Sequence, residues 1–264
     1  MIAAVCFSLW IGSPAVADEP SSFADEFIGN FSQLDPIYFI AGANPTNAKF
    51  QFSFKYRLFG AGPNRAPEWS WLNGFYLGYT QTSFWDLEAP SAPFRDSSFR
   101  PALIYQFEFK KNSYVPGAPI SYLRIGAEHE SNGKDGLSTR SLNTVYVEPN
   151  AVFNLGGDWR VALNARAWFY AGTPNDNPDI QDFRGNVKMG VGITEIGGFG
   201  AMVRLGGNPG TGNGSAQLDV TYALSDLIGL DLYLTGQMFA GYGESLLNYN
   251  RKDTRIRFGF SIIR

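Results

Sequence analysis

Apolar and polar side chains alternate along most of the chain, in segments of about ten residues. Over residues 50–58, Phe50 and each second residue after it are apolar, and the residues between them are polar or charged. The alternation returns over residues 160–170 and 216–224, and turns rich in Gly, Pro, Asn or Asp separate the segments. A period of two is typical of a β-strand with one apolar face and one polar face.

These segments predict an all-β, antiparallel sheet of about twelve strands. The polar face carries Arg, Lys, Glu and Asp in strand after strand. A transmembrane barrel turns such a face towards a polar lumen and its apolar face towards lipid, whereas a secreted β-sandwich turns the charges to water. An even number of strands closes a barrel without edges, so the pattern favours the barrel over the sandwich. The predicted strands cover residues 36–44, 48–59, 75–87, 97–111, 121–131, 141–155, 159–172, 184–197, 199–208, 214–224, 230–245 and 254–264.

The N-terminus lacks this alternation. Residues 1–17 contain a short apolar run followed by Ala-Val-Ala, which resembles a secretory signal peptide with its cleavage site. The competing interpretation is a short buried or interfacial helix. Residues 18–35 are expected to form an N-terminal arm or a short helix, and the barrel is assigned to residues 36–264.

Composition excludes several classes of protein. Charged residues make up 17% of the chain and the net charge is −3, so the clustered basic excess that binds nucleic acid is missing. No later segment has the roughly 18 consecutive apolar residues that a membrane-spanning helix needs. The only cysteine, Cys6, lies in the signal-like segment. A secreted soluble protein and a barrel in the outer membrane of a Gram-negative bacterium remain.

The only histidine, His129, stands two residues before Ser131 in the sequence E-H-E-S-N-G. Side chains two positions apart on a strand point to the same face, so both residues share the apolar outer face with Ile125. Glu128 and Glu130 have the opposite parity and point into the lumen, where we expect a network of ion pairs. The strand therefore carries two polar side chains on a face that should contact lipid.

Asn143 lies on the outer face of the next predicted strand, and a hairpin would bring it beside His129. Polar groups at this depth must hydrogen-bond one another, because each unpaired group costs several kcal/mol in lipid. An adjacent base activates a serine, and an amide oxygen can orient the imidazole. The pattern thus points to a Ser-His-Asn site that cleaves an acyl ester of a lipid; the competing interpretation is ordinary turn residues near a loop.

Residues 129–143, H-E-S-N-G-K-D-G-L-S-T-R-S-L-N, resemble the active-site segment of the outer-membrane phospholipase A family. The family pattern is His-x-Ser-Asn-Gly, a polar loop, and Ser-Arg-Ser-x-Asn at this spacing. The resemblance implies a twelve-stranded outer-membrane barrel that hydrolyses phospholipids and lysophospholipids, requires Ca²⁺ and is active as a homodimer. Further segments in the family's order are Y-T-Q-T-S-F-W (79–85), S-A-P-F-R-D (91–96), N-D-N-P-D-I (175–180) and G-Y-G-E-S-L-L-N-Y-N (241–250).

The resemblance also implies roles for single residues. Ser131 would be the nucleophile, and His129 would be the general base and then the general acid. Asn143 would orient the imidazole, and the backbone N–H of Gly133 would help to stabilise the oxyanion.

The implied calcium ligands match the family less closely. Lys134, which would contribute its backbone carbonyl, stands where the family often has Arg. Thr139 stands where the family often has Ser, and the neighbouring Ser138 is the competing candidate. Ser91 would be the third ligand, supplied across the dimer interface.

Gln81 projects from the apolar face of its predicted strand. The resemblance implies that it lies in the dimer interface and hydrogen-bonds its symmetry mate, whereas the competing interpretation places it among lipid headgroups.

Two other functions of the protein remain open. A passive channel or structural barrel would explain the alternation but not the polar groups on the lipid face, and a lipid A deacylase would apply the same chemistry to another substrate.

Overall fold

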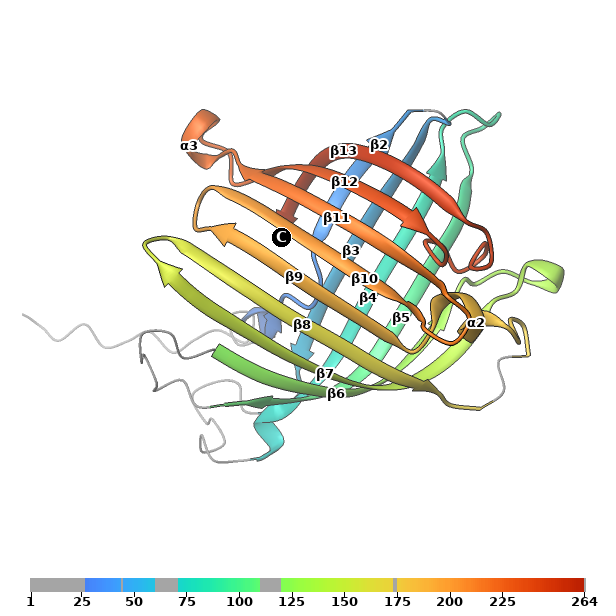
Figure 1. Ribbon diagram of the computed structural model, residues 1–264, viewed down its shortest axis with the longest axis horizontal. Coiled ribbons are helices and arrows are strands. Elements are labelled where there is room, and N and C mark those ends of the chain that lie inside the picture. The colour runs from blue at the N-terminus through green and yellow to red at the C-terminus, as the bar shows by residue number, and fades with distance from the viewer. Residues whose placement is uncertain (1–26, 44, 60–70, 110–119, 173–174, 264) are drawn as a thin grey trace, which may run out of the picture.

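The computed structural model describes residues 27–43, 45–59, 71–109, 120–172 and 175–263 (Figure 1). The predicted signal peptide lies outside these residues, as does the first part of the predicted N-terminal arm. Within the described residues, no helix has the length and apolar character needed to cross a bilayer.

Thirteen strands form one antiparallel sheet in the described chain. The pairing of β13 with β2 closes the sheet, so the twelve strands β2–β13 form a barrel, and the short β1 pairs with β3. The strands are β1 (Phe31–Ser32), β2 (Ile37–Gly42), β3 (Asn47–Arg57), β4 (Phe75–Asp86), β5 (Phe94–Glu108), β6 (Ile120–Ser131), β7 (Ser141–Gly156), β8 (Trp159–Tyr170), β9 (Val187–Glu195), β10 (Phe199–Asn208), β11 (Asn213–Ala223), β12 (Tyr233–Gly241) and β13 (Asp253–Ile263). Short helices lie between strands: η1 (Trp71–Gly74), η2 (Gly136–Ser138), α2 (Ile180–Arg184) and α3 (Ser225–Ile228).

The predicted twelve-stranded barrel is confirmed, and two predicted strands are shorter than expected. The strand predicted at 184–197 begins at Val187, because α2 occupies the preceding residues. The strand predicted at 230–245 ends at Gly241, whose φ of 126° turns the chain away from the wall. A Cβ at this glycine would lie 2.2 Å from the carbonyl oxygen of Gly214 on the paired strand, so the close approach needs glycine here.

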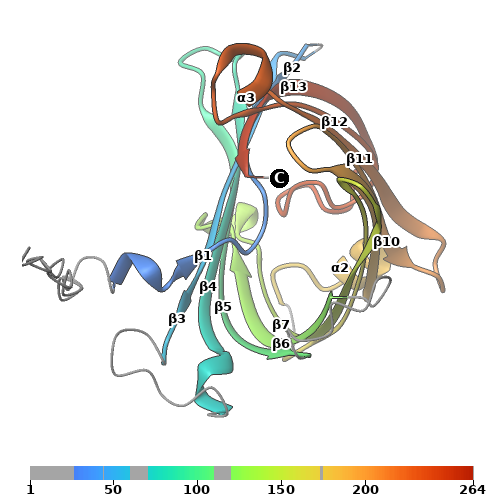
Figure 2. The same ribbon diagram turned by 90° about the vertical axis from the view of Figure 1, so that its left-hand side faces the viewer.

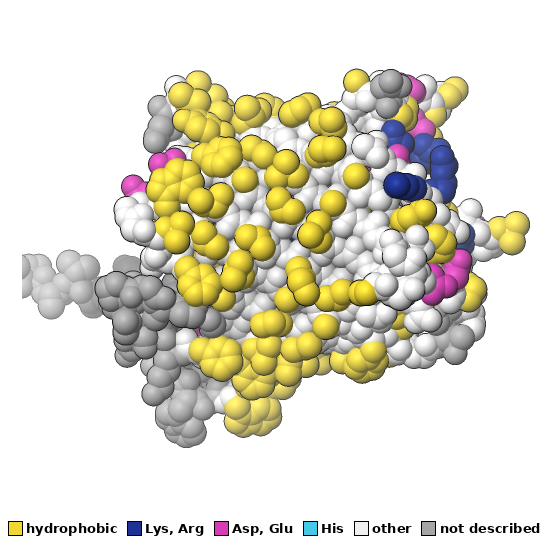
Figure 3. All heavy atoms as spheres, in the orientation of Figure 1, with side chains coloured by type: hydrophobic (Ala, Val, Ile, Leu, Met, Phe, Trp, Pro, Cys, Tyr) yellow, Lys and Arg dark blue, Asp and Glu magenta, His cyan; other side chains and the backbone are white. Residues whose placement is uncertain are grey.

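The two faces of the wall divide as the alternation predicts. Phe52, Leu103 and Phe258 are among many large apolar side chains that are exposed on the outer face. Figure 3 shows apolar side chains spread over this wall, while Lys, Arg, Asp and Glu gather mainly at one end. Lys49 and Arg124 are among the charged residues that are buried inside. Such a distribution suits a wall in lipid around a polar lumen.

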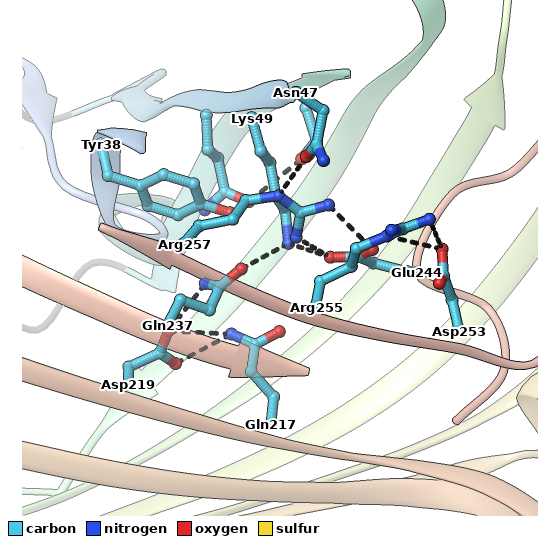
Figure 4. A network of polar contacts seen from close by, with 12 residues as sticks. Tyr38, Asn47, Lys49, Gln217, Asp219, Gln237, Glu244, Asp253, Arg255 and Arg257 are labelled. Carbon is cyan, nitrogen blue, oxygen red and sulfur yellow. Dashed lines mark hydrogen bonds and ion pairs between the residues drawn. The ribbon is translucent and has the colours of Figure 1, made fainter. Parts of the chain in front are cut away.

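Ion pairs and hydrogen bonds fill the lumen. Lys49 Nζ donates to Gln237 Oε1 at 2.8 Å, and Arg257 Nε donates to Asn47 Oδ1 at 2.7 Å. Both cations also bind Glu244, which lies on the loop between β12 and β13 (Figure 4). This network therefore ties that loop to the inside of the wall.

Three connections cover one end of the barrel, which we call the capped end. Their described residues are 132–140, 171–172, 175–186 and 242–252, and they lie on the right in Figure 1, near α2. Side chains of the second and third connections pack with residues of β7 and β8 in a small core, in which Ile180 and Leu246 are each 1% exposed. The other members of this core are Leu142, Tyr249, Tyr170 and Phe183.

Residues 27–32 lie on the outer side of the wall (Figure 2), whereas residues 33–36, which follow them, line the lumen. Residues 27–29 form a helical turn that leads into β1. The ring of Phe27 lies 5.5 Å from the ring of Tyr56, and the ring of Phe31 lies 5.3 Å from that of Phe54. These aromatic contacts hold the segment against β3.

Candidate active site

The β6–β7 hairpin carries the predicted catalytic residues at the capped end. Its register sets His129 opposite Asn143 and Ser131 opposite Ser141. His129 and Asn143 are exposed, and the face they share also carries the exposed Ile125. The hairpin therefore brings the imidazole and the amide together on the outer wall of the barrel.

A hydrogen bond joins His129 and Asn143. The distance from Nδ1 of His129 to Oδ1 of Asn143 is 2.8 Å. An amide oxygen only accepts, so the proton of a neutral imidazole lies on Nδ1 in this arrangement. The Nε2 atom is then the unprotonated nitrogen, which can take a proton from a hydroxyl group.

Ser131 lies two residues further along the same face and is partly buried. No hydrogen bond joins its hydroxyl group to His129 in the described part of the chain. Catalytic hydrogen bonds are often long without substrate and tighten in the complex. The structure thus places the serine and the imidazole on one face, without a direct contact between them.

Gly133 begins the turn after Ser131. Its φ is 64°, and a Cβ at this position would lie 3.2 Å from a ring carbon of Phe99. Glycine is therefore the residue that suits this backbone. Within the described residues, the Gly133 N–H has no hydrogen-bond acceptor, so this donor is available to a developing oxyanion.

Two of the predicted calcium ligands meet in the same turn. The Thr139 hydroxyl group donates to the carbonyl oxygen of Lys134 at 3.0 Å. Ser138 instead offers its own carbonyl to the Asn132 side chain, at 2.9 Å. The contact therefore brings Thr139, rather than Ser138, to the Lys134 carbonyl.

The donor set of this turn suits a hard cation only in part. Hydroxyl and carbonyl oxygens are ligands that Ca²⁺ takes, but six to eight are needed. No group of three or more His, Cys, Asp or Glu that could hold a metal occurs among residues 27–263 wherever they are described. Ser91 lies exposed on the β4–β5 connection with a φ of 66°, and within the described single chain it does not contact Lys134 or Thr139.

Glu128 and Glu130 point into the lumen, as expected, and form ion pairs there. Glu128 lies 3.1 Å from Arg166, and Glu130 lies 2.9 Å from Arg184 of α2. Burial alone would lower the pKa of Arg184, but Glu130 outweighs this effect and raises it. The two carboxylates therefore stiffen the inner face of the strand that carries His129 and Ser131.

A shallow groove of about 750 Å³ leads away from the hairpin over the outer wall. His129 and Asn143 line one part of it, and the aromatic contacts of the N-terminal segment line another. Its remaining lining is almost wholly apolar. Residues from β3 to β7 contribute, among them Phe54, Tyr56, Leu77, Tyr79, Pro101, Leu103, Ala127 and Val145, together with Phe27 and Phe31.

Gln81 lies on the outer side of β4 and is partly exposed. Its Oε1 accepts a hydrogen bond from the Tyr79 hydroxyl group at 2.9 Å, and its Nε2 donates to Ser83 Oγ at 3.1 Å. The amide is thus hydrogen-bonded within its own strand in the single chain.

Sequence reasoning missed two buried polar residues beside the turn that follows Ser131. Asn132 is 4% exposed and Asp96 is 2% exposed, and their side chains contact each other. The only signal in the sequence was the Asn-Gly pair after Ser131, which indicates a turn but not its partners.

Comparison with known proteins agrees with this geometry. Residues 31–262 match the family described as Phospholipase A1. Phospholipase A1 of Escherichia coli K12 is 30% identical over 221 residues, which is 82% of this chain and 70% of that protein. The Klebsiella pneumoniae Phospholipase A1 is 32% identical over 186 residues, 70% of this chain and 61% of that protein.

Two solved structures share the fold. The outer membrane phospholipase A from Escherichia coli gives a TM-score of 0.71 at 25% identity, covering 90% of this chain and 97% of that chain. The Salmonella typhi outer membrane phospholipase dimer with bound calcium gives the same TM-score, identity and coverage. The chain is therefore an outer-membrane β-barrel and belongs to the phospholipase A1 family of hydrolases.

Proposed function

We propose that the chain is a calcium-dependent serine hydrolase that cleaves acyl esters of phospholipids and lysophospholipids and is active as a homodimer. The observation that carries this proposal is the hydrogen bond from His129 to Asn143 on the outer wall, beside Ser131. A buried lumen would give such a pair no access to lipid. On the outer wall, the acyl ester of a membrane lipid is the electrophile within reach.

The chemistry follows from the three side chains. Asn143 keeps the proton of His129 on Nδ1, so Nε2 takes the Ser131 proton as Oγ attacks the acyl carbonyl carbon. The Gly133 N–H donates to the oxyanion of the tetrahedral intermediate. When the carbon–oxygen bond to glycerol breaks, His129 returns the proton to the leaving alkoxide. Water then attacks the acyl-serine with His129 again as base. As the bond between the acyl carbon and Ser131 Oγ breaks, His129 returns the proton to Oγ and the fatty acid is released.

Calcium would be held by the Lys134 carbonyl oxygen, Thr139 and Ser91 of the partner subunit. The close approach of Thr139 Oγ1 to the Lys134 carbonyl supports the first two. A cation bound there supplies positive charge next to the oxyanion. A second chain and water would complete the six to eight oxygen ligands that Ca²⁺ takes.

The groove supplies a surface for the acyl chain. It begins at His129 and Asn143 and continues over apolar side chains of the outer wall. Burial of methylene groups there would be worth about 0.8 kcal/mol each. The competing channel function would not explain the hydrogen-bonded polar pair on the outer wall.

A covalent probe tests the nucleophile. A sulfonyl fluoride with a long alkyl chain should label the wild type on Ser131, as located by mass spectrometry of the labelled peptide. Ser131→Ala should not react. Ser141→Ala is the matched control, since Ser141 is the directly paired serine on the same face, and it should react like the wild type. Labelling that persists in Ser131→Ala would refute the proposed nucleophile.

A further inference from the structure

The side chain of Asn132 organises the turn that follows Ser131. Its Nδ2 donates to the Ser138 carbonyl at 2.9 Å. Its Oδ1 accepts from the backbone N–H of Arg140 at 3.0 Å and, more weakly, from that of Lys134 at 3.4 Å. One buried amide thus bonds three backbone groups of a turn in which strand pairing has ended.

Asp96 contacts the side chain of Asn132. This carboxylate lies on β5, and its Oδ1 accepts from Asn132 Nδ2 at 3.5 Å. Its Oδ2 accepts from the backbone N–H of Leu247 at 2.8 Å. Leu247 belongs to the loop at residues 242–252, so Asp96 joins the turn both to the wall and to the capped end.

The same turn carries the groups that the proposed chemistry needs. The Gly133 N–H and the Lys134 carbonyl both lie in it, and neither belongs to a strand. Thr139 bonds Lys134 across the turn. Oxyanion donors and metal ligands act only when they are held within fractions of an ångström, so whatever fixes this turn also fixes the site.

We propose that Asn132 is a positioning residue, held by Asp96, that sets the Gly133 N–H and the Lys134 carbonyl relative to Ser131. This inference rests on the proposed function. It assigns Asn132 no contact with substrate or metal. The residue acts from the inner side of the barrel on groups that face outwards.

Asn132→Ala tests this role. The variant should fold, because the lost bonds lie in one turn at the end of the barrel. We expect kcat at saturating calcium to fall by about 100-fold, which is the decrease in kcat caused by removing one oriented hydrogen-bond donor to the oxyanion. The calcium dissociation constant, measured by titration calorimetry without substrate, should rise at least about tenfold. The KM for phospholipid should stay within about twofold, since the groove is untouched.

Asn132→Asp is the second variant. It keeps the size of the side chain and an acceptor for the Arg140 N–H, but loses the donor to Ser138 and places a second carboxylate beside Asp96. Its calcium affinity and kcat should also fall. The matched control is Asn150→Ala, a partly buried asparagine further along the same hairpin, whose amide bonds only Glu148. This control should keep kcat and calcium affinity within about twofold.

The outcomes separate the alternatives. A merely structural role predicts a smaller folded fraction with unchanged kcat per folded barrel, and that result would overturn the inference, as would wild-type calcium affinity in both Asn132 variants. If the wild type hydrolyses no phospholipid, the proposed function fails, and calorimetry still reports whether Asn132 sets the calcium site.

Discussion

Asn143 and His129 lie where polar side chains are expensive, on a wall otherwise covered by groups such as Ile125 and Val147. Their hydrogen bond offsets part of the cost of removing both from water. If the pair were only structural, this hydrogen bond between the two side chains would be sufficient. The catalytic explanation also requires that Asn143 set the tautomer of the imidazole, and this can be measured.

Replacing Asn143 should therefore affect the reaction more than binding. We expect Asn143→Ala to lower kcat by about 10- to 100-fold, because the Nδ1 proton loses the acceptor that orients the ring. The KM for phospholipid in mixed micelles should change little. Steady-state kinetics of the refolded variant measure both constants, and wild-type kcat in this variant would refute the orienting role.

The sequence predicted where His129 and Asn143 lie, but it did not predict the buried residues Asp96 and Asn132 beside them. Strand parity alone put His129 on the outer face, and the spacing to Asn143 put the two side by side, as the register shows. Asp96 and Asn132 could not be paired in advance, because they lie 36 positions apart and their contact depends on the register between β5 and β6 and on the turn that follows β6. A buried Asn and Asp in a turn sequence look like ordinary turn residues.

At the scale of elements, the helical turn at residues 27–29 and β1 shape the groove. Phe27 and Phe31 lean on the aromatic side chains of β3 and form the part of the groove lining contributed by the N-terminus. Apolar and polar residues do not alternate in this segment, so this packing could not be predicted from periodicity. If the acyl chain of the substrate lies along the groove, these two rings limit the length of acyl chain that the groove can hold.

Phe31→Ala should therefore shift the preference towards longer acyl chains. Each additional methylene accommodated is worth about 0.8 kcal/mol, so relative kcat/KM for the longer substrate should rise by about fourfold per methylene. Phe258→Ala, which removes an exposed ring outside the groove, is the control. Competition between phospholipids that differ only in chain length measures the ratio, and an unchanged ratio in Phe31→Ala would contradict this role.

The loop at residues 242–252 is held by charge as well as by its apolar core. Burial raises the pKa of Glu244, but Lys49 and Arg257 outweigh burial and hold that pKa below its usual value of 4.5. A depressed carboxyl pKa stabilises the fold above the unfolded-state pKa and loses that contribution as pH falls through the folded-state pKa.

Glu244→Gln should accordingly destabilise the barrel in a pH-dependent way. At pH 7 we expect a loss of about 3 kcal/mol, because two buried cations lose their partner. The difference between wild type and variant should shrink as the pH falls below the usual carboxyl range, where Glu244 itself becomes protonated. Urea unfolding at a series of pH values measures this difference. If the difference in unfolding free energy between wild type and variant stays constant down to strongly acidic pH, the assigned ion pairs are wrong.

At the scale of the whole molecule, the barrel presents the hydrogen-bonded pair of His129 and Asn143, the groove and Gln81 on one side of its wall. The strands involved, β3 to β7, are consecutive in the sheet. The related Salmonella typhi phospholipase has been crystallised as a dimer with bound calcium. The closed barrel was predictable from the alternation of apolar and polar residues. Dimerisation was not, because a single sequence does not indicate which surfaces of two barrels contact each other.

Gln81 should contribute modestly to such a dimer. Its amide already bonds Tyr79 and Ser83, so pairing with a symmetry mate exchanges bonds rather than adding them. We expect Gln81→Ala to weaken dimerisation by about 1 kcal/mol, roughly fivefold in the dimer dissociation constant. Sedimentation equilibrium in detergent with calcium gives this constant. A change of less than twofold would place Gln81 outside the interface.

The most direct measurement is the release of fatty acid from phospholipid by the refolded, detergent-solubilised barrel, with calcium and with a chelator. Wild type and Ser131→Ala should be compared, with Ser141→Ala as the matched serine control. We predict calcium-dependent release by wild type and by the control, and none by Ser131→Ala. If all three proteins are folded barrels and none releases fatty acid, or if Ser131→Ala is as active as wild type, the proposed lipid-facing triad is wrong.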